Sequence, residues 1–354
     1  MSLLKETLDK IKPHDPVARA KARARLEQLT MPPWALGRLM DLAQELAGMT
    51  GSMSPATASK IIVVMAGDHG VTAEGVSKFP SEVTAQMVRN FVNGGAGINA
   101  LARQAGAGVV VVDMGVAHDL SDLAKTGKIL SHRVAPGTKN MAQGPAMSGE
   151  QALKAIEAGI RVALQLGTQA DVFGTGEMGI GNTTASSAIV SLVCGVPVRE
   201  VTGRGTGITD AQMEHKVQII QRAMDLNRPD PKDGLDVLSK IGGFEIGGLA
   251  GLILGCASLR KPVLVDGFIS TAGALIAQRL CPAAGDYMIA AHRSAEQGHR
   301  TALEALKKNP LLDLGMRLGE GTGAALAMNL VEAAVRILTE VATFDDAIVS
   351  RADK

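Results

Sequence analysis

The spacing of apolar residues divides the chain into an N-terminal helical segment and a longer segment with a different pattern. Between residues 36 and 47, apolar side chains recur every three or four positions, as on one face of a helix. Pro32-Pro33 precedes this helix, and the stretch 51–58 is rich in Ser, Thr and Pro, as expected of a linker. Residues 1–50 are therefore expected to be mainly helical.

From residue 60 onward, short apolar or β-branched runs alternate with glycine-rich loops and helical stretches. This alternation predicts an α/β fold in which helices cover both faces of a parallel sheet. After residue 320, a long pattern of Ala, Leu, Met and Val predicts a helix that ends near Val341. We expect residues 60–315 to form the α/β domain, and residues 1–55 and 320–354 to form a small helical domain from both chain ends. The runs expected to be strands are 61–65, 109–112, 171–173, 196–201, 263–265 and 287–290.

Polar residues follow each of these runs. In open α/β sheets, ligands bind at the carboxyl ends of the strands, and the polar residues collect where that rule places a site. They are Asp68-His69-Gly70, Asp113, Glu177, Arg204, Asp266 and His292.

Composition narrows the choice of function. The formal net charge is +1, and the 354 residues include 41 Gly but only 6 Phe, 1 Tyr and 1 Trp. Proteins that bind single-stranded nucleic acid need stacked aromatic rings and a basic groove, so no nucleic-acid partner is expected. The glycine content indicates many tight turns, which allow a backbone to approach a ligand closely.

Cysteine usage and hydropathy point to a cytoplasmic protein. The three Cys residues are widely spaced, so neither a disulfide framework nor a CxxC metal site is indicated, and a reducing compartment fits. Residues 1–12 lack the apolar core of a signal peptide. The apolar stretch 246–259 is short of the ~20 residues that span a bilayer, so no membrane contact is expected. No HxxxH or HExxH pattern occurs, so no metal site is expected.

A glycine-rich loop at residues 174–184 follows an expected strand and opens a helix. It contains the GxGxxG pattern of dinucleotide-binding proteins at Gly174, Gly176 and Gly179, which makes an NAD(P)-dependent oxidoreductase one interpretation. Glu177 lies inside the turn, where a pyrophosphate would sit, and two anions there repel each other. A plain strand-to-helix turn with a surface glutamate is an equally good interpretation.

A second glutamate, Glu320, is flanked by glycines at an expected helix start. A carboxylate in this position complements the helix dipole, which is the simpler interpretation. It could also act as a general base, because glycine neighbours let a substrate approach and apolar neighbours such as Leu318 raise its pKa.

Two expected helix starts carry the features of a phosphate site. Residues 203–207 precede a helix whose Thr209 and Gln212 form a capping box, with Lys216 on the same face. A second capping pair is expected at Ser294 and Gln297, after Arg293. Free amide groups beside a cation suit a phosphomonoester, although ordinary capping explains the same residues.

Several of these motifs together resemble the nicotinate-nucleotide–dimethylbenzimidazole phosphoribosyltransferase family. The similarity runs from about residue 32 to residue 341. The most specific segments are 65–71 (MAGDHGV), 176–184 (GEMGIGNTT), 233–244 (DGLDVLSKIGGF), 265–268 (VDGF) and 316–323 (MRLGEGTG). The resemblance implies a Rossmann-like domain with a small helical domain, assembled as a homodimer. It also implies transfer of phosphoribose from nicotinate mononucleotide to 5,6-dimethylbenzimidazole or a related base, without a cofactor or metal.

The resemblance also implies roles for individual residues. Glu320 corresponds to the family's general base, and Glu177 lies near the nucleotide. The remaining implied contacts are Gly205, Lys216, Ser294, Gly298, Asn182 and Thr183 for the nucleotide and its phosphate, and Phe79, Gln86, Met87, Gly179, Ile180 and Leu318 for the base pocket.

The base pocket departs from the family pattern at two positions. Some members carry a small hydroxyl residue where Phe79 stands, and a glutamine where Met87 stands. Here the glutamine is Gln86, which is turned by about 100° on a helix. The pocket wall is therefore expected to be more apolar, and benzimidazoles, purines and phenolics remain open as acceptors. A non-catalytic nucleotide-binding protein is a third interpretation, although intact Glu177, Glu320 and Lys216 argue against it.

Overall fold

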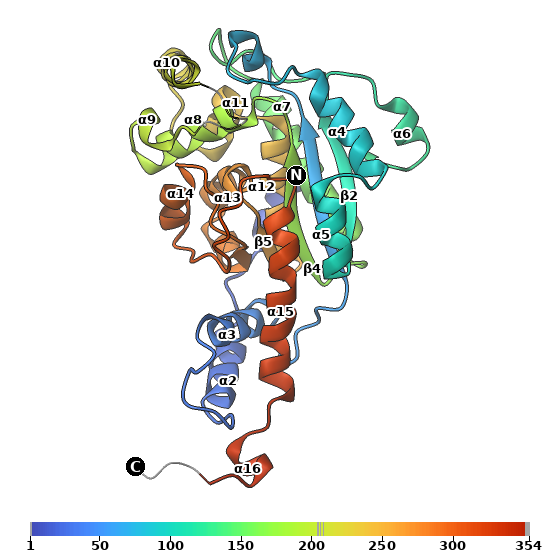
Figure 1. Ribbon diagram of the computed structural model, residues 1–354, viewed down its shortest axis with the longest axis vertical. Coiled ribbons are helices and arrows are strands. Elements are labelled where there is room, and N and C mark those ends of the chain that lie inside the picture. The colour runs from blue at the N-terminus through green and yellow to red at the C-terminus, as the bar shows by residue number, and fades with distance from the viewer. Residues whose placement is uncertain (1, 204, 206, 208, 351–354) are drawn as a thin grey trace.

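The computed structural model describes residues 2–203, 205, 207 and 209–350, and a six-stranded sheet lies at its centre (Figure 1). All neighbouring strands are parallel, in the order β3-β2-β1-β4-β5-β6, which is the doubly wound order of Rossmann-type folds. The strands are β1 (Lys60–Gly67), β2 (Ala107–Gly115), β3 (Leu130–Ser131), β4 (Val172–Met178), β5 (Val263–Val265) and β6 (Met288–Ala290).

Helices connect the strands and cover the sheet. The first half of the chain contains α1 (Leu3–Lys10), α2 (Pro16–Leu26), α3 (Arg38–Thr50), the 3-10 helix η1 (Gly70–Glu74), α4 (Glu82–Val92), α5 (Gly97–Ala105), α6 (Ser121–Lys125) and α7 (Gly149–Leu166). The second half contains α8 (Asn182–Cys194), α9 (Val198–Val201), α10 (Asp210–Asn227), α11 (Gly234–Ile241), α12 (Phe244–Ser258), α13 (Phe268–Leu280), the 3-10 helix η2 (Pro282–Tyr287), α14 (His299–Leu306), α15 (Thr322–Glu340) and α16 (Phe344–Ala347).

The central strand β1 is buried on both faces, which explains its unbroken apolar sequence. Residues 62–66 are fully buried. Successive side chains of a strand point to opposite faces. Ile62 accordingly points toward the start of α15, and Met65 points toward α12. Helices α15 and α12 therefore cover opposite faces of the sheet, as the alternating sequence pattern predicted.

The two ends of the chain meet below the sheet. In Figure 1, α2, α3, the lower part of α15 and α16 extend beyond the α/β body. α15 packs against β4, β5 and α5 at the sheet and against α3 farther along, and the Arg25 guanidinium donates hydrogen bonds to the Leu338 and Val341 carbonyls. α1 instead packs against α7 and α12 in the α/β body. The division into domains at residues 55, 60 and 320 stays a prediction.

One local expectation was wrong, and one strand was not foreseen. The run 196–201 is not a strand, because residues 198–201 form the short helix α9 with Pro197 at its N-cap. Proline has no N–H for a strand ladder and suits a helix start instead. The sequence also gave no indication of β3, whose two residues pair with Val112 and Asp113.

Among the residues that the structure describes, one helix is long and apolar enough to span a membrane. This helix is α15, and 56% of its apolar stretch is buried inside the fold. Its hydrophobicity is therefore accounted for in large part by packing against the sheet, α5 and α3.

Candidate active site

A cavity of about 800 Å³ opens at the carboxyl ends of the central strands. Its walls come from the end of β4 and the start of α8, from the loops after β5 and β6, from α4, and from the loop before α15. This is the position at which doubly wound sheets bind ligands. The lining includes apolar side chains, among them Phe79, Val83, Met87 and Leu318, and the charged side chains of Lys216, Glu296 and Arg317. Lys216 and Arg317 both lie beside Gly205, whereas Leu318 lies with the Glu320 carboxylate beside Gly97.

The cavity brings together all of the expected site residues except Gln86 and Gly298. Gln86 lies exposed on α4, one position before Met87, which lines the cavity. Gly298 is the N-cap of α14, and a Cβ there would lie 2.7 Å from the Val201 carbonyl oxygen, so this glycine serves helix packing. The residues that line the cavity as expected are Phe79, Met87, Glu177, Gly179, Ile180, Asn182, Thr183, Gly205, Lys216, Ser294, Leu318 and Glu320.

Glu320 lies in a turn of three consecutive residues with left-handed backbone. The φ angles of Gly319, Glu320 and Gly321 are 81°, 61° and 93°. Only glycine adopts this region without steric cost, so Glu320 is held there by its surroundings. Its Oε2 accepts a hydrogen bond of 3.0 Å from the Ile98 N–H, at the start of α5.

Burial raises the pKa of Glu320. The Ile98 N–H acts in the opposite direction, and the nearby carboxylate of Asp266 adds to the increase. A carboxylate with a raised pKa is a stronger base than an exposed one, and Glu320 faces the cavity. The arrangement can therefore accept a proton from a ligand bound at the apolar end.

Glu177 is buried next to Glu320 at the end of β4. Its Oε2 accepts a hydrogen bond of 2.5 Å from the Asn182 amide, and its Oε1 accepts one of 3.3 Å from the Glu320 N–H. Burial raises the pKa of Glu177 to about 8, and the charges of Asp266 and Glu245 contribute. The side chain is therefore mostly protonated at neutral pH in the empty cavity.

The cavity is also lined by a buried lysine. The Lys216 ammonium donates a hydrogen bond of 2.8 Å to the Thr183 hydroxyl, at the start of α8. Burial lowers the pKa of Lys216 to about 8, and the charge of Glu296 acts in the opposite direction. The cation, the Thr183 hydroxyl and Gly205 form a site that suits an anion.

The predicted phosphate motif is only partly described by the structure. Thr209 and Gln212 form the expected capping box at the start of α10, but Arg204 and Thr206 lie outside the described residues. The second capping pair was wrong, because α14 begins at His299 rather than near Ser294. Ser294 is fixed instead by its N–H, which donates to His299 Nδ1 at 2.8 Å.

The other polar residues expected at strand ends have different roles. Asp113 accepts hydrogen bonds from the Gly115 and Val116 N–H groups in its own turn. His69 forms a buried pair with Glu245 on α12, with 2.6 Å between His69 Nε2 and Glu245 Oε1. A Cβ on Gly181, which lines the cavity, would lie 3.3 Å from His69 Cβ, but neither His69 nor Glu245 lines the cavity itself.

The glycines of the dinucleotide pattern serve contacts within the protein. Gly174 and Gly176 lie inside β4, and Cβ atoms there would be 2.4 Å from the Ile62 side chain and from the Glu320 carbonyl oxygen. A Cβ on Gly179 would lie 2.2 Å from the Gly67 carbonyl oxygen. The pattern does not form a pyrophosphate turn, so the oxidoreductase interpretation loses its basis.

Sequence reasoning missed part of the lining. Glu296, Ile269 and Ser270 also line the cavity, each within a few residues of a position that the motifs had marked. His292, which was expected among the polar residues at strand ends, lines the cavity as well, beside buried Asp266. Among the described residues, no group of three or more His, Cys, Asp or Glu side chains is arranged to hold a metal ion.

Comparison with known proteins yields consistent matches over the whole chain. Residues 11–349 match a family model described as phosphoribosyltransferase. The nicotinate-nucleotide–dimethylbenzimidazole phosphoribosyltransferase of Syntrophotalea carbinolica is 65% identical over 351 residues, covering 99% of both chains. The protein of the same name from Desulfotalea psychrophila is 57% identical over 355 residues, covering 100% of both. A crystal structure of this enzyme from Thermus thermophilus superimposes with a TM-score of 0.90 and 45% identity, covering 96% of this chain and 100% of the other.

Proposed function

The chain belongs to the nicotinate-nucleotide–dimethylbenzimidazole phosphoribosyltransferase family, and from this premise we propose that it transfers the 5-phosphoribosyl group of nicotinate mononucleotide to 5,6-dimethylbenzimidazole. The products are α-ribazole 5′-phosphate and nicotinate. One observation carries the proposal: a single cavity is lined by a buried cation, a buried carboxylate and several apolar side chains.

The chemistry of the leaving group explains why one carboxylate suffices. The ring nitrogen of nicotinate mononucleotide is positively charged, so nicotinate leaves with a neutral ring nitrogen and needs no general acid. Glycoside hydrolases, in contrast, need a pair of carboxyl groups. The benzimidazole attacks C1′ through its lone-pair nitrogen, on the face opposite the leaving group, which inverts the configuration from β to α. Its other nitrogen then carries an acidic proton, which Glu320 accepts.

The two ends of the cavity suit the two substrates. Lys216, Thr183, Gly205 and Ser294 bind the 5′-phosphate in this proposal, and Glu177 with Asn182 lies beside the ribose. The base is held by Phe79, Met87, Gly179, Ile180 and Leu318, and Phe79 is 48% exposed at the cavity rim. An apolar wall favours the methylated benzimidazole over a purine, whose polar edge would lose its hydrogen bonds to water.

The proposed reaction is tested by mixing the protein with nicotinate mononucleotide and a panel of aromatic bases and following nicotinate release. We expect release with 5,6-dimethylbenzimidazole and slower release with adenine or phenol. Absence of nicotinate release with every base would contradict the transferase assignment.

The role of Glu320 is tested by Glu320→Gln, which preserves shape and can still accept the Ile98 hydrogen bond. We expect kcat to fall by ~10²–10⁴-fold because the proton acceptor is lost. Glu340→Gln, at the exposed far end of the helix α15 that follows the Glu320 turn, is the matched control and should retain wild-type turnover. Near wild-type turnover of Glu320→Gln, with both substrates bound, would exclude Glu320 as the base.

We also propose that the protein is a cytoplasmic homodimer, as the family resemblance implies. Light scattering of the purified chain measures its mass in solution and tests the dimer directly.

A further inference from the structure

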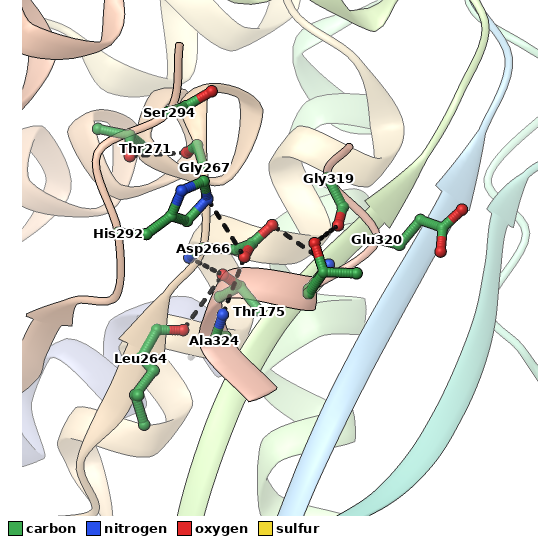
Figure 2. Close-up of polar contacts among 12 residues, drawn as sticks. Thr175, Leu264, Asp266, Gly267, Thr271, His292, Ser294, Gly319, Glu320 and Ala324 are labelled. Atoms are coloured by element: carbon green, nitrogen blue, oxygen red, sulfur yellow. Dashed lines mark hydrogen bonds and ion pairs between the residues drawn. The ribbon is translucent and has the colours of Figure 1, made fainter. Parts of the chain in front are cut away.

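Asp266 and His292 form a buried pair between the two ends of the cavity, and neither has a part in the proposed chemistry. Both side chains are 1% exposed. Asp266 follows β5 directly, and His292 follows β6 by two residues. His292 Nε2 lies 3.7 Å from Asp266 Oδ1, within ion-pair range (Figure 2).

Asp266 holds the turn that carries Glu320. Its Oδ2 accepts a hydrogen bond of 3.2 Å from the Gly321 N–H, and its Oδ1 accepts one of 2.9 Å from the Ala324 N–H (Figure 2). These are free N–H groups at the start of α15, where the N-cap residue Gly321 has no side chain to satisfy them. A carboxylate from a neighbouring strand thus takes the place of a local cap.

His292 packs against the same turn of α15. A Cβ on Gly323 would lie 2.0 Å from His292 Cδ2, so the ring lies directly on the helix backbone. Neither ring nitrogen of His292 has a hydrogen-bond partner. A buried imidazole without partners is unfavourable by itself, and Asp266 is the carboxylate within ion-pair range of it.

The segment after His292, which includes Ser294 of the proposed phosphate site, is held in place by hydrogen bonds. The Ser294 N–H donates to His299 Nδ1, and the Thr271 hydroxyl lies 2.9 Å from His299 Nε2. Burial lowers the pKa of His299 to about 3, so its ring is neutral. Since His299 Nδ1 accepts a hydrogen bond from the Ser294 N–H, the ring proton is on Nε2, which donates a hydrogen bond to the Thr271 hydroxyl. That hydroxyl in turn donates a hydrogen bond of 2.8 Å to the Gly267 carbonyl (Figure 2).

We propose that Asp266 and His292 are positioning residues that fix the Glu320 turn relative to the phosphate-site segment 292–294. Asp266 accepts hydrogen bonds from the Gly321 and Ala324 N–H groups of the turn. His292, in the segment that also carries Ser294, contacts Asp266 from the other side. A substrate anchored by its phosphate then presents C1′ at a set distance from the base that Glu320 orients. This inference rests on the proposed phosphoribosyl transfer, because it assigns the two ends of the cavity to phosphate and base.

The test measures kcat, KM and the Kd for nicotinate mononucleotide in Asp266→Asn, His292→Ala and the double variant. Misplacement of reacting groups by about 1 Å can reduce rates ~10²-fold, so we expect kcat to fall at least ~10-fold while Kd changes less than ~3-fold. His292→Gln, whose amide can again reach Asp266, should recover part of the loss. The double variant should lose no more than the worse single variant, because both act through one contact.

Two controls separate the outcomes. His118→Ala, in the exposed loop after β2, should match the wild type. Thermal unfolding of each variant identifies those that fail to fold. If His292→Ala does not fold, kcat of His292→Gln is compared with that of the wild type instead. Multiplicative losses in the double variant, or wild-type kcat in folded His292→Ala, would overturn the positioning role. Absence of nicotinate release by the wild-type protein would instead contradict the proposed function.

Discussion

Glu320 occupies a backbone conformation that glycine adopts more readily than glutamate. Left-handed backbone at a residue with a side chain costs about 1 kcal/mol and persists where neighbouring groups hold it. Here the Glu320 N–H is held by Glu177 and the next N–H by Asp266, both of them carboxylates at strand ends. The conformation points the Glu320 carboxylate at the start of α5, where it meets the Ile98 N–H.

Replacing Glu320 by glycine should leave a more stable fold than replacing it by alanine, and both variants should lose activity. Glu320→Gly relieves the left-handed strain, whereas Glu320→Ala removes the same carboxylate but keeps a Cβ. We expect the glycine variant to have a free energy of unfolding about 1 kcal/mol above that of the alanine variant, measured by urea denaturation. Equal stabilities would show that the turn stores no backbone strain.

The sequence could predict which residues carry chemistry but not how they are connected. Glycines on both sides of Glu320 and Glu177 marked these residues, and each lines the cavity. Gln86 was misplaced because the neighbouring Met87 is the one that α4 turns toward the cavity. The Asp266–His292 contact joins residues from two different strand ends, and no local spacing predicts that they meet.

At the scale of elements, apolar runs predicted strands well where the run is buried in the sheet. The run 61–65 lies within β1, which is paired on both sides. The run 196–201 also contains β-branched residues, but it includes Pro197 and two charged residues, and residues 198–201 form α9 instead. β3 pairs through only two residues, so its register is set by the loop around it rather than by a sequence pattern.

Helices α7 and α12 pack so closely that their glycines are required. A Cβ on Gly251 would lie 1.9 Å from the Ile156 carbonyl oxygen, and one on Gly159 would lie 2.0 Å from the Gly248 carbonyl oxygen. Backbone atoms cannot yield as flexible side chains can. The packing therefore fixes the distance of α7 from the sheet that α12 covers.

Gly251→Ala should destabilise the protein even though alanine favours helices more than glycine does. Overpacking of this kind costs about 1–3 kcal/mol, which exceeds the gain in helix propensity of ~1 kcal/mol. Gly149→Ala is the matched control, because nothing lies within 4 Å of a Cβ at the start of α7. Chemical denaturation should show a loss for Gly251→Ala alone, and equal stability of the two variants would contradict the close helix contact.

At the scale of the whole molecule, the cavity concentrates acidic groups whose protonation is linked to folding. Burial raises the pKa values of Glu177, Asp266, Glu320 and Glu296 above those of an unfolded chain. The folded protein therefore retains protons that the unfolded chain has already released. The free energy of unfolding therefore depends on the protonation of the acidic groups at the active site.

The ligand-free protein should lose stability as the pH rises from 6 to 8. An unfolded glutamate releases its proton near pH 4.5, whereas Glu177 retains its own up to about 8. Between these values the folded state binds more protons, so the stabilisation present below pH 4.5 is lost as the pH rises to about 8. The loss between pH 6 and 8 is on the order of 2 kcal/mol from Glu177 alone, since each pH unit corresponds to ~1.4 kcal/mol.

Glu177→Gln isolates this contribution, because the amide cannot titrate and can still accept the hydrogen bond from the Glu320 N–H. We expect urea denaturation at several pH values to show a flatter profile for this variant than for the wild type. Just above pH 8 the slope should reverse, because Lys216, with its pKa lowered to about 8, releases its proton before an unfolded lysine does. Above pH 9 the reversal should fade, because burial raises the pKa of the Cys256 thiol and the folded chain keeps a proton that an unfolded cysteine loses. A wild-type profile as flat as that of Glu177→Gln would mean that Glu177 is already ionised in the empty cavity at neutral pH.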